Sequence, residues 1–247
     1  MLIINPGMQK SGSAYLYNLI NELVVAADGT DAGEVKKKYK LGWLMRQANN
    51  NIGRPFFWKL FLLWLISIKE APFVVKTHSG PTLAVKLFNA LGLVKIIYIY
   101  RDPRDVMLSA IDHGKRIRAQ GESHTFASFT NIDIALKNTA NWVKRWERYN
   151  KMPGTLMIKY EDLLSKTGSS LAEIAKHLDI SRVSYYEELT AIIWKYNKSN
   201  NQTNKGSLHL NKAKAFRYKH EMDKQDLEKI NNKLGEKIKN MGYDVVT

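Results

Sequence analysis

The chain has 247 residues, of which 45% are hydrophobic, so it is long enough to bury a full core in one domain. Its formal net charge of +15 favours an anionic partner, without separating nucleic acid, membrane surface and acidic small molecules. The absence of cysteine excludes disulfides and thiolate metal sites. A strand pattern begins at Leu2, and the longest apolar run (56–68) contains Lys59 and is short for a bilayer, so we expect a cytoplasmic protein without stable membrane insertion.

The first predicted elements are a strand at residues 2–4, a loop at 5–13 and a helix whose apolar residues recur with helical spacing. The loop contains two glycines, two serines and Lys10. Unpaired N–H groups at a helix N-terminus can hold a phosphate, and glycines let the ligand come close to the backbone. Lys10 precedes Gly12, whereas the lysine of the usual nucleotide-triphosphate loop follows the last glycine. A turn without a ligand is the alternative for this loop taken alone.

The remaining elements alternate between helix and strand. Residues 56–66 are apolar nearly all round, which favours a buried helix over a pocket wall or a lipid-contacting surface. Further strands are predicted at 73–75, 94–100 and 156–158, and further helices at 83–91, 125–149 and 227–241, with a mobile loop at 197–205. The sequence therefore predicts one α/β domain over residues 1–247, a P-loop-like three-layer sandwich with a central parallel sheet flanked by helices.

Each predicted strand is followed by a cationic side chain. Lys10 follows the first strand, Lys76 and His78 the second, Arg101 the third and Lys159 the fourth. Ligands of open parallel sheets bind beyond the carboxyl ends of the strands. Like charges that converge there are costly unless an anion neutralises them, so this edge is a predicted anion site.

The third strand end carries a helix-start signal. Asp102 is a good N-cap, Pro103 suits the first turn, and Asp105 has the spacing of a capping box. Ser109 follows two turns later, and a hydroxyl bonded back to its own helix is its alternative role. Arg101 could likewise belong to a structural ion pair.

His78 has two interpretations. A single histidine near a strand end is more often structural, and the histidines of this chain show no metal-ligand spacing. Between Lys76 and the glycine-containing loop it becomes a candidate general base, because imidazole titrates near neutrality.

These segments together resemble the sulfotransferases that use 3′-phosphoadenosine 5′-phosphosulfate (PAPS). Residues 9–15, Gln-Lys-Ser-Gly-Ser-Ala-Tyr, are similar to the family's 5′-phosphosulfate loop, and residues 76–78 match its catalytic Lys-Thr-His. Residues 98–109 resemble its 3′-phosphate segment, including the arginine-to-serine spacing, and residues 159–163 its Tyr-Glu-Asp-Leu stretch. Each motif alone is weak, whereas the combination is specific.

The resemblance implies a metal-free transfer of a sulfuryl group from PAPS to a hydroxyl or amine of a small molecule. His78 would take the acceptor's proton, while Lys10 and Lys76 would stabilise developing charge. The resemblance further implies a cofactor-binding set: Lys10, Ser11, Gly12, Ser13, Ala14, Tyr15, Arg101, Ser109, Tyr160, Lys205 and Gly206.

Three positions depart from the family pattern. Tyr15 stands where an adenine-stacking Trp is common, and Ala14 replaces a hydroxyl. The family's late Arg-Lys-Gly is only partly present as residues 204–206, and Arg217 could substitute for its arginine. The acceptor is expected near residues 28–71 and the loop near Asn197.

Two other functions fit parts of the sequence. A P-loop kinase of a small metabolite would match the strand-loop-helix start but needs magnesium, and no persuasive metal-binding Asp follows a strand. A non-catalytic binder of nucleic acid or acidic lipid would match the charge and the apolar 56–68 segment, and its binding would weaken steeply with salt. With the sulfotransferase as the first hypothesis, the expected partners are a nucleotide cosubstrate and a small-molecule acceptor, and no nucleic acid.

Overall fold

The structure is a computed structural model that describes residues 1–46, 49–180 and 214–245. The described part contains a parallel four-stranded sheet in the order β2-β1-β3-β4. Its strands are β1 (Leu2–Pro6), β2 (Phe73–Thr77), β3 (Val94–Tyr100) and β4 (Thr155–Lys159). All four strand predictions are confirmed within a residue or two at each end.

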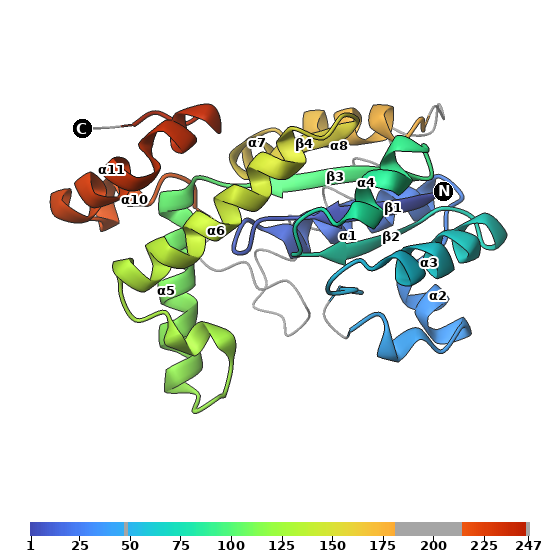
Figure 1. Cartoon of the computed structure of the whole chain (residues 1–247), viewed down its shortest axis with the longest axis horizontal. Helices are drawn as coiled ribbons and strands as arrows, with labels where there is room; N and C mark the ends of the chain where they lie inside the picture. The colour runs from blue at the N-terminus through green and yellow to red at the C-terminus, as the bar shows by residue number, and fades with distance from the viewer. Residues whose placement is uncertain (47–48, 181–213, 246–247) are drawn as a thin grey trace.

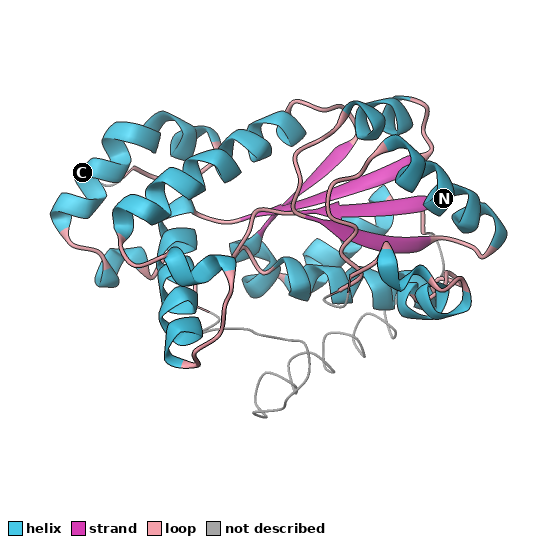
Figure 2. Ribbon diagram, turned by 60° about the horizontal axis from the view of Figure 1, so that its bottom comes forward, coloured by secondary structure: helices cyan, strands magenta, loops and turns pink. Residues whose placement is uncertain are grey.

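Helices cover the sheet on both faces, as Figure 2 shows. The helices up to β3 are α1 (Ser13–Ala26), α2 (Ala32–Lys38), the short η1 (Leu41–Trp43), α3 (Phe57–Lys69) and α4 (Leu83–Ala90). Those that follow are α5 (Pro103–Ala119), η2 (Thr125–Ser128), α6 (Ile132–Asn150), α7 (Tyr160–Ser165), α8 (Thr167–His177), α10 (Tyr218–Glu221) and α11 (Lys224–Asn240). The predicted α/β sandwich with a central parallel sheet is confirmed.

The core lies in two clusters, one on each face of the sheet. Alternate residues of a strand point to opposite faces, so Leu2 and Ile4 join the cluster packed by α3, α4, α5, α6 and α11, whereas Ile3 joins the cluster packed by α1, α7 and α8. Every residue of β1 and β2 is buried. This two-sided burial explains why the strands are short continuous apolar runs instead of alternating ones.

Helix α3 differs from its prediction. The structure buries the side of α3 that carries Leu60, Leu63 and Ile66. Large apolar side chains on its other side are exposed: Phe57, Trp58, Phe61, Leu65 and Ile68. The prediction of a buried helix is therefore wrong for this outer face, because a segment that is apolar all round carries no periodicity to show which side packs.

Within the described residues, no helix has the length and apolarity that crossing a bilayer requires.

The predicted helix at 125–149 begins later than expected. Residues 125–128 form the separate turn η2, and α6 starts at Ile132, where the Asn131 side chain accepts a hydrogen bond from the backbone N–H of Ile134. The apolar residues of η2 happen to continue the helical spacing of α6, so this spacing did not show where α6 begins. The Asn131 cap sets the start of α6.

Figure 1 shows α10 and α11 beside α5, at the end of the molecule opposite α2. Contacts join α10 to α5 and α11 to α6. The C-terminal helices therefore pack on α5 and α6, whereas residues 49–54 lie along β2.

Candidate active site

The loop after β1 leaves the N-terminus of α1 open. Gly12, the N-cap, has a φ of 76°, a left-handed conformation that glycine adopts without strain, and α1 begins at Ser13. The buried Ser11 hydroxyl donates to the Met8 carbonyl oxygen at 2.5 Å and thereby closes the loop on itself. The first backbone N–H groups of α1 have no side-chain cap, so they are available to an anion.

Tyr160 connects this loop with the end of β3. A Cβ atom on Gly12 would lie 2.5 Å from a ring carbon of Tyr160, so only glycine allows the ring to pack against the loop. The Arg101 guanidinium lies 4.5 Å from the centroid of the same ring. Gly12, Tyr160 and Arg101 thus bring three of the expected cofactor-binding positions into contact.

Lys10 is held in an unfavourable environment for a cation. Its φ is 63°, and its Nζ makes a favourable contact with the Phe126 ring, whose centroid lies 5.4 Å away. Burial lowers the pKa of Lys10 to about 8, with Arg116 and Arg101 adding to the decrease and Asp112 opposing it. An anion bound at the loop would relieve this repulsion, so the site favours binding of a negatively charged group.

His78 is oriented as a neutral imidazole. Its Nδ1 lies 2.9 Å from the Gly7 carbonyl oxygen, which can only accept, so Nδ1 carries the proton and Nε2 keeps its lone pair. Burial, followed by the charge of Lys76, lowers the pKa of His78 to about 4. His78 is therefore unprotonated at neutral pH and ready to accept a proton at Nε2.

Helix α6 fixes the backbone that follows His78. Arg145 donates to the His78 carbonyl oxygen at 2.8 Å, and Arg148 donates to that of Pro81 at 3.0 Å. The Tyr149 hydroxyl donates to the Ser79 carbonyl oxygen at 3.3 Å. The imidazole is thus held by Gly7 on its ring and by α6 on its main chain.

Lys76 lies inside the sheet, between Asn5 of β1 and Asn51 of the preceding segment. It is buried, and burial lowers its pKa to about 8. Lys76 does not line the cavity described below, and its effect on His78 is electrostatic.

A cavity of about 780 Å³ opens over the loop after β1. It brings together five of the expected site residues: Lys10, Gly12, Ser13, Ala14 and His78. Its remaining walls include Phe126, Phe129, Asn138 and Trp142, which no motif indicated. Their pattern predicted a helix, and only the packing of α6 and η2 against α5 shows that one side of it faces a cavity.

Tyr15 is not at the cavity. It is 3% exposed and packs in the core cluster formed by α1, α7 and α8. Burial raises the pKa of its phenol, and the hydroxyl is hydrogen-bonded to Thr167. The structure therefore shows no open aromatic face at Tyr15 for an adenine ring.

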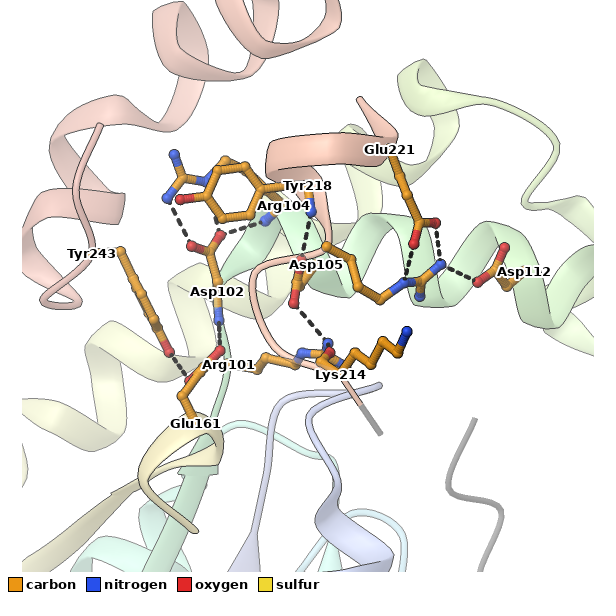
Figure 3. A network of polar contacts seen from close by, with 11 residues as sticks. Arg101, Asp102, Arg104, Asp105, Asp112, Glu161, Lys214, Tyr218, Glu221 and Tyr243 are labelled. Carbon is orange, nitrogen blue, oxygen red and sulfur yellow. Dashed lines mark hydrogen bonds and ion pairs between the residues drawn. The ribbon is translucent and has the colours of Figure 1, made fainter. Parts of the chain in front are cut away.

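A buried polar network lies beyond β3 (Figure 3). Asp102 pairs with Arg104 through contacts of 2.9 and 2.7 Å and also caps α5 by accepting from the Arg104 backbone N–H. The Arg104 guanidinium donates to the Asp244 carbonyl oxygen at 2.8 Å and lies 3.7 Å from the Tyr218 ring centroid. The network thus ties the start of α5 to the C-terminal segment.

Asp105 does not complete a capping box, contrary to the sequence prediction. Its carboxylate accepts from Arg101 at 2.7 Å and from the Tyr218 backbone N–H at 3.0 Å. The backbone N–H of Asp102 instead donates to Glu161 at 3.3 Å. The prediction is wrong because residues far away in the sequence supply better-placed partners than the local helix turn.

The expected 3′-phosphate residues have different surroundings. Arg101 forms its ion pair with Asp105, as the structural alternative predicted, and also donates to the Lys214 carbonyl oxygen at 2.7 Å. Its buried Nε has no hydrogen-bond partner within the part of the chain that the structure describes. Ser109 is buried on α5. Arg217 pairs with Asp112 and Glu221, and Lys205 and Gly206 lie outside the described residues.

Comparisons with known proteins find relatives in sequence and in fold. A 111-residue stretch is 32% identical to the luciferin sulfotransferase of Photinus pyralis, covering 42% of this chain and 29% of that protein. The structure of mouse sulfotransferase SULT7A1 complexed with PAP covers 97% of this chain and 85% of its own, with 18% identity and a TM-score of 0.64. Retinol dehydratase in a complex with retinol and PAP covers 100% and 83%, with 18% identity and a TM-score of 0.61.

The family itself is shown by the sequence match. Residues 2–242 match the family model described as the sulfotransferase domain. This match includes β1 with its loop, the His78 strand end and the Arg101 segment. The chain belongs to the sulfotransferase family.

Proposed function

We propose that the protein transfers a sulfuryl group from PAPS to a hydroxyl or amine of a small molecule by in-line displacement, with His78 as general base. The observation that supports this most is the shared cavity, which exposes both the Nδ1-protonated imidazole of His78 and the uncapped N-terminus of α1 with Lys10. The mouse sulfotransferase and retinol dehydratase structures, both complexed with PAP, share the fold and support the choice of cofactor.

The residues present fit a nucleotide with 5′- and 3′-anionic groups. Lys10 and the backbone N–H groups of residues 11–14 would hold the 5′ end, since the helix N-terminus there is uncapped. Arg101 would hold the 3′-phosphate, because its buried Nε is an unused donor within the described part of the chain, and Ser109 would add a hydroxyl. The Tyr160 ring would hold Arg101 and Gly12 in place, because it packs against both. When bound, PAPS supplies the sulfuryl group.

His78 and the two lysines have different roles in the transfer. The acceptor's proton moves to Nε2 of His78, while the Gly7 carbonyl oxygen keeps Nδ1–H in place and stabilises the imidazolium that forms. Lys10, which lines the cavity, and Lys76, which acts through its field from its buried position in the sheet, stabilise negative charge that develops on the leaving oxygen, and their burial strengthens this effect. This role requires both lysines in their charged form.

Replacement of His78 tests the base assignment. The His78→Ala variant should lose about 10²- to 10⁴-fold in kcat, the range of one general base, while its affinity for 3′-phosphoadenosine 5′-phosphate (PAP) stays within about twofold. The exposed His220 provides the matched control, and His220→Ala should keep wild-type turnover. Retained turnover in His78→Ala would remove His78 from the base role. A His78→Ala protein that keeps normal turnover but no longer binds PAP would also contradict the proposal, because the reaction requires the nucleotide to bind.

A further inference from the structure

The cavity is strongly cationic. Five of its lining side chains carry positive charge, namely Lys10, Arg46, Arg54, Arg116 and Arg145. The lining that the structure describes contains no Asp or Glu. If the proposed function holds, the nucleotide accounts for Lys10, while the 3′-phosphate is assigned to Arg101, which does not line the cavity. Four arginines therefore remain to be explained.

Two of the four already have a structural task. Arg145 donates to the His78 carbonyl oxygen, and Arg116 donates to Nδ1 of His113 at 3.0 Å. Neither Arg46 nor Arg54 has an ion pair with any described acidic residue, and both are exposed. Burial, followed by the charge of Arg46, lowers the pKa of Lys59, so a second cation lies near Arg46.

The order of segments across the sheet separates Arg46 and Arg54 from the nucleotide side. Residues 49–54 lie on the outer edge of β2, where the Ile52 N–H donates to the Lys76 carbonyl oxygen at 3.0 Å and the Thr77 hydroxyl donates to that of Gly53 at 2.6 Å. Arg46 pairs with Asn51 of this segment. The order is then residues 49–54 with Arg46, β2 with His78, β1 with its loop, and β3 with Arg101. Arg46 and Arg54 are therefore on the far side of His78 from Arg101.

An aromatic wall lies in the same cavity. Phe129 and Trp142 stack with centroids 5.8 Å apart and an interplanar angle of 20°, and Phe126 lies 5.0 Å from Phe129. Phe129 and Trp142 are buried, and the half-buried Phe126 is the ring of this wall that an apolar ligand ring can contact. Cations without acidic partners beside an aromatic wall match a ligand that carries a ring and a negative charge.

We propose that the acceptor is an aromatic hydroxyl or amine compound that also bears an anionic group. Arg46 and Arg54 bind the anionic group, Phe126 contacts the ring with Phe129 and Trp142 packed against it, and the hydroxyl or amine meets Nε2 of His78. This proposal rests on the proposed function and specifies the acceptor of the same site. Its product carries two negative charges, one brought by the acceptor and one on the new sulfate.

A matched pair of ligands tests the proposal. The probes are 3-(4-hydroxyphenyl)propionate and its methyl ester, which share the phenol and differ in the charge. Calorimetric titration of the PAP-loaded protein should give an affinity about tenfold or more higher for the carboxylate, the size expected for hydrogen bonds to a charged group. With PAPS, the same preference should appear in kcat/KM, mainly through KM.

Charge removal locates the effect. Arg46→Gln combined with Arg54→Gln should abolish the preference for the carboxylate and leave the affinity for PAP within about twofold. The double variant Lys37→Gln with Lys40→Gln removes the same net charge from exposed lysines on and after α2, and it should keep the preference. A preference lost equally in both double variants would point to the net charge and overturn the assignment to Arg46 and Arg54.

The outcomes separate the two proposals. Equal binding of carboxylate and ester to the PAP-loaded protein, or binding of neither, overturns the anionic-acceptor proposal while PAP binding leaves the sulfotransferase proposal standing. Failure to bind PAP at all contradicts the proposed function itself.

Discussion

The arginines on the two sides of the cavity differ in their partners. Beyond β3, the guanidinium groups of Arg101, Arg104 and Arg217 are buried and each lies 2.7 Å from a carboxylate oxygen. Beyond β2, Arg46 and Arg54 are exposed and form no ion pair with a described acidic residue. The sequence contains arginines on both sides, and only the contacts distinguish them.

This difference indicates a division of tasks. A buried arginine without its carboxylate would be an uncompensated charge, so the β3 side depends on its pairs for stability. An exposed arginine keeps its hydration and costs little without a partner, so the β2 side can hold unpaired charge until an anion arrives. We therefore expect substitutions on the β3 side to change folding, with Arg101 also affecting nucleotide binding, and those on the β2 side to change binding alone.

The largest expected effect is on stability at Asp102. The Asp102→Ala variant leaves Arg104 buried without its carboxylate and removes the N-cap of α5, so it should lower the free energy of unfolding by about 3–5 kcal/mol. Urea unfolding followed by circular dichroism measures this change. Arg54→Ala is the comparison and should stay within about 0.5 kcal/mol of wild type. Equal stability of the two variants would contradict the division.

The second effect concerns pH and nucleotide affinity. Lys10 and Lys76 have pKa values lowered to about 8, so both are charged below that pH and lose the charge as the pH rises through it. An anion binds the charged form, so PAP affinity should fall at least about tenfold between about pH 7 and pH 9. Calorimetric titration across this range measures the fall. The Lys10→Arg variant should show a smaller fall, and a slope unchanged from wild type would exclude Lys10 as its source.

The smallest effect is expected at Tyr243. Its hydroxyl donates to Glu161 at 2.8 Å, and Tyr243→Phe should cost about 1 kcal/mol of unfolding free energy at neutral pH. Burial raises the pKa of Glu161, and the Tyr243 hydrogen bond opposes that rise. The pKa of Glu161 is therefore higher in the folded state than in the unfolded state, and in Tyr243→Phe it is higher still. Protonation of Glu161 at low pH thus stabilises the folded variant more than the folded wild type. The loss of unfolding free energy caused by Tyr243→Phe should therefore shrink as the pH falls. A cost that grows toward acid pH would contradict this role of Glu161.

Much of the fold could be predicted because its signals are local. The four strands are short buried runs, and the Asp102 cap with Pro103 marks the start of α5 directly in the sequence. The exposure of the outer face of α3 and the start of α6 could not be predicted. The apolar residues of α3 show no periodicity, and the start of α6 depends on the single Asn131 cap. The single domain over residues 1–247 and the cytoplasmic location stay predictions.

The site was predictable only where a strand end fixes it. Lys10 and His78 follow adjacent parallel strands, and the structure brings both to the cavity. Phe126 and Trp142 reach the same cavity through the packing of η2 and α6, and no sequence motif indicates this packing. Asp105 shows the converse, because its spacing indicated a local cap while its partners are Arg101 and a residue 113 positions away.

The most direct test of the account is calorimetric titration of the purified protein with PAP in EDTA at moderate salt, with ATP plus magnesium as the comparison. The account predicts metal-free PAP binding that ATP with magnesium does not match, weakened in both Lys10→Ala and Arg101→Ala. Absence of PAP binding, or a preference for ATP with magnesium, would contradict the assignment of the loop after β1 and of Arg101 to the nucleotide.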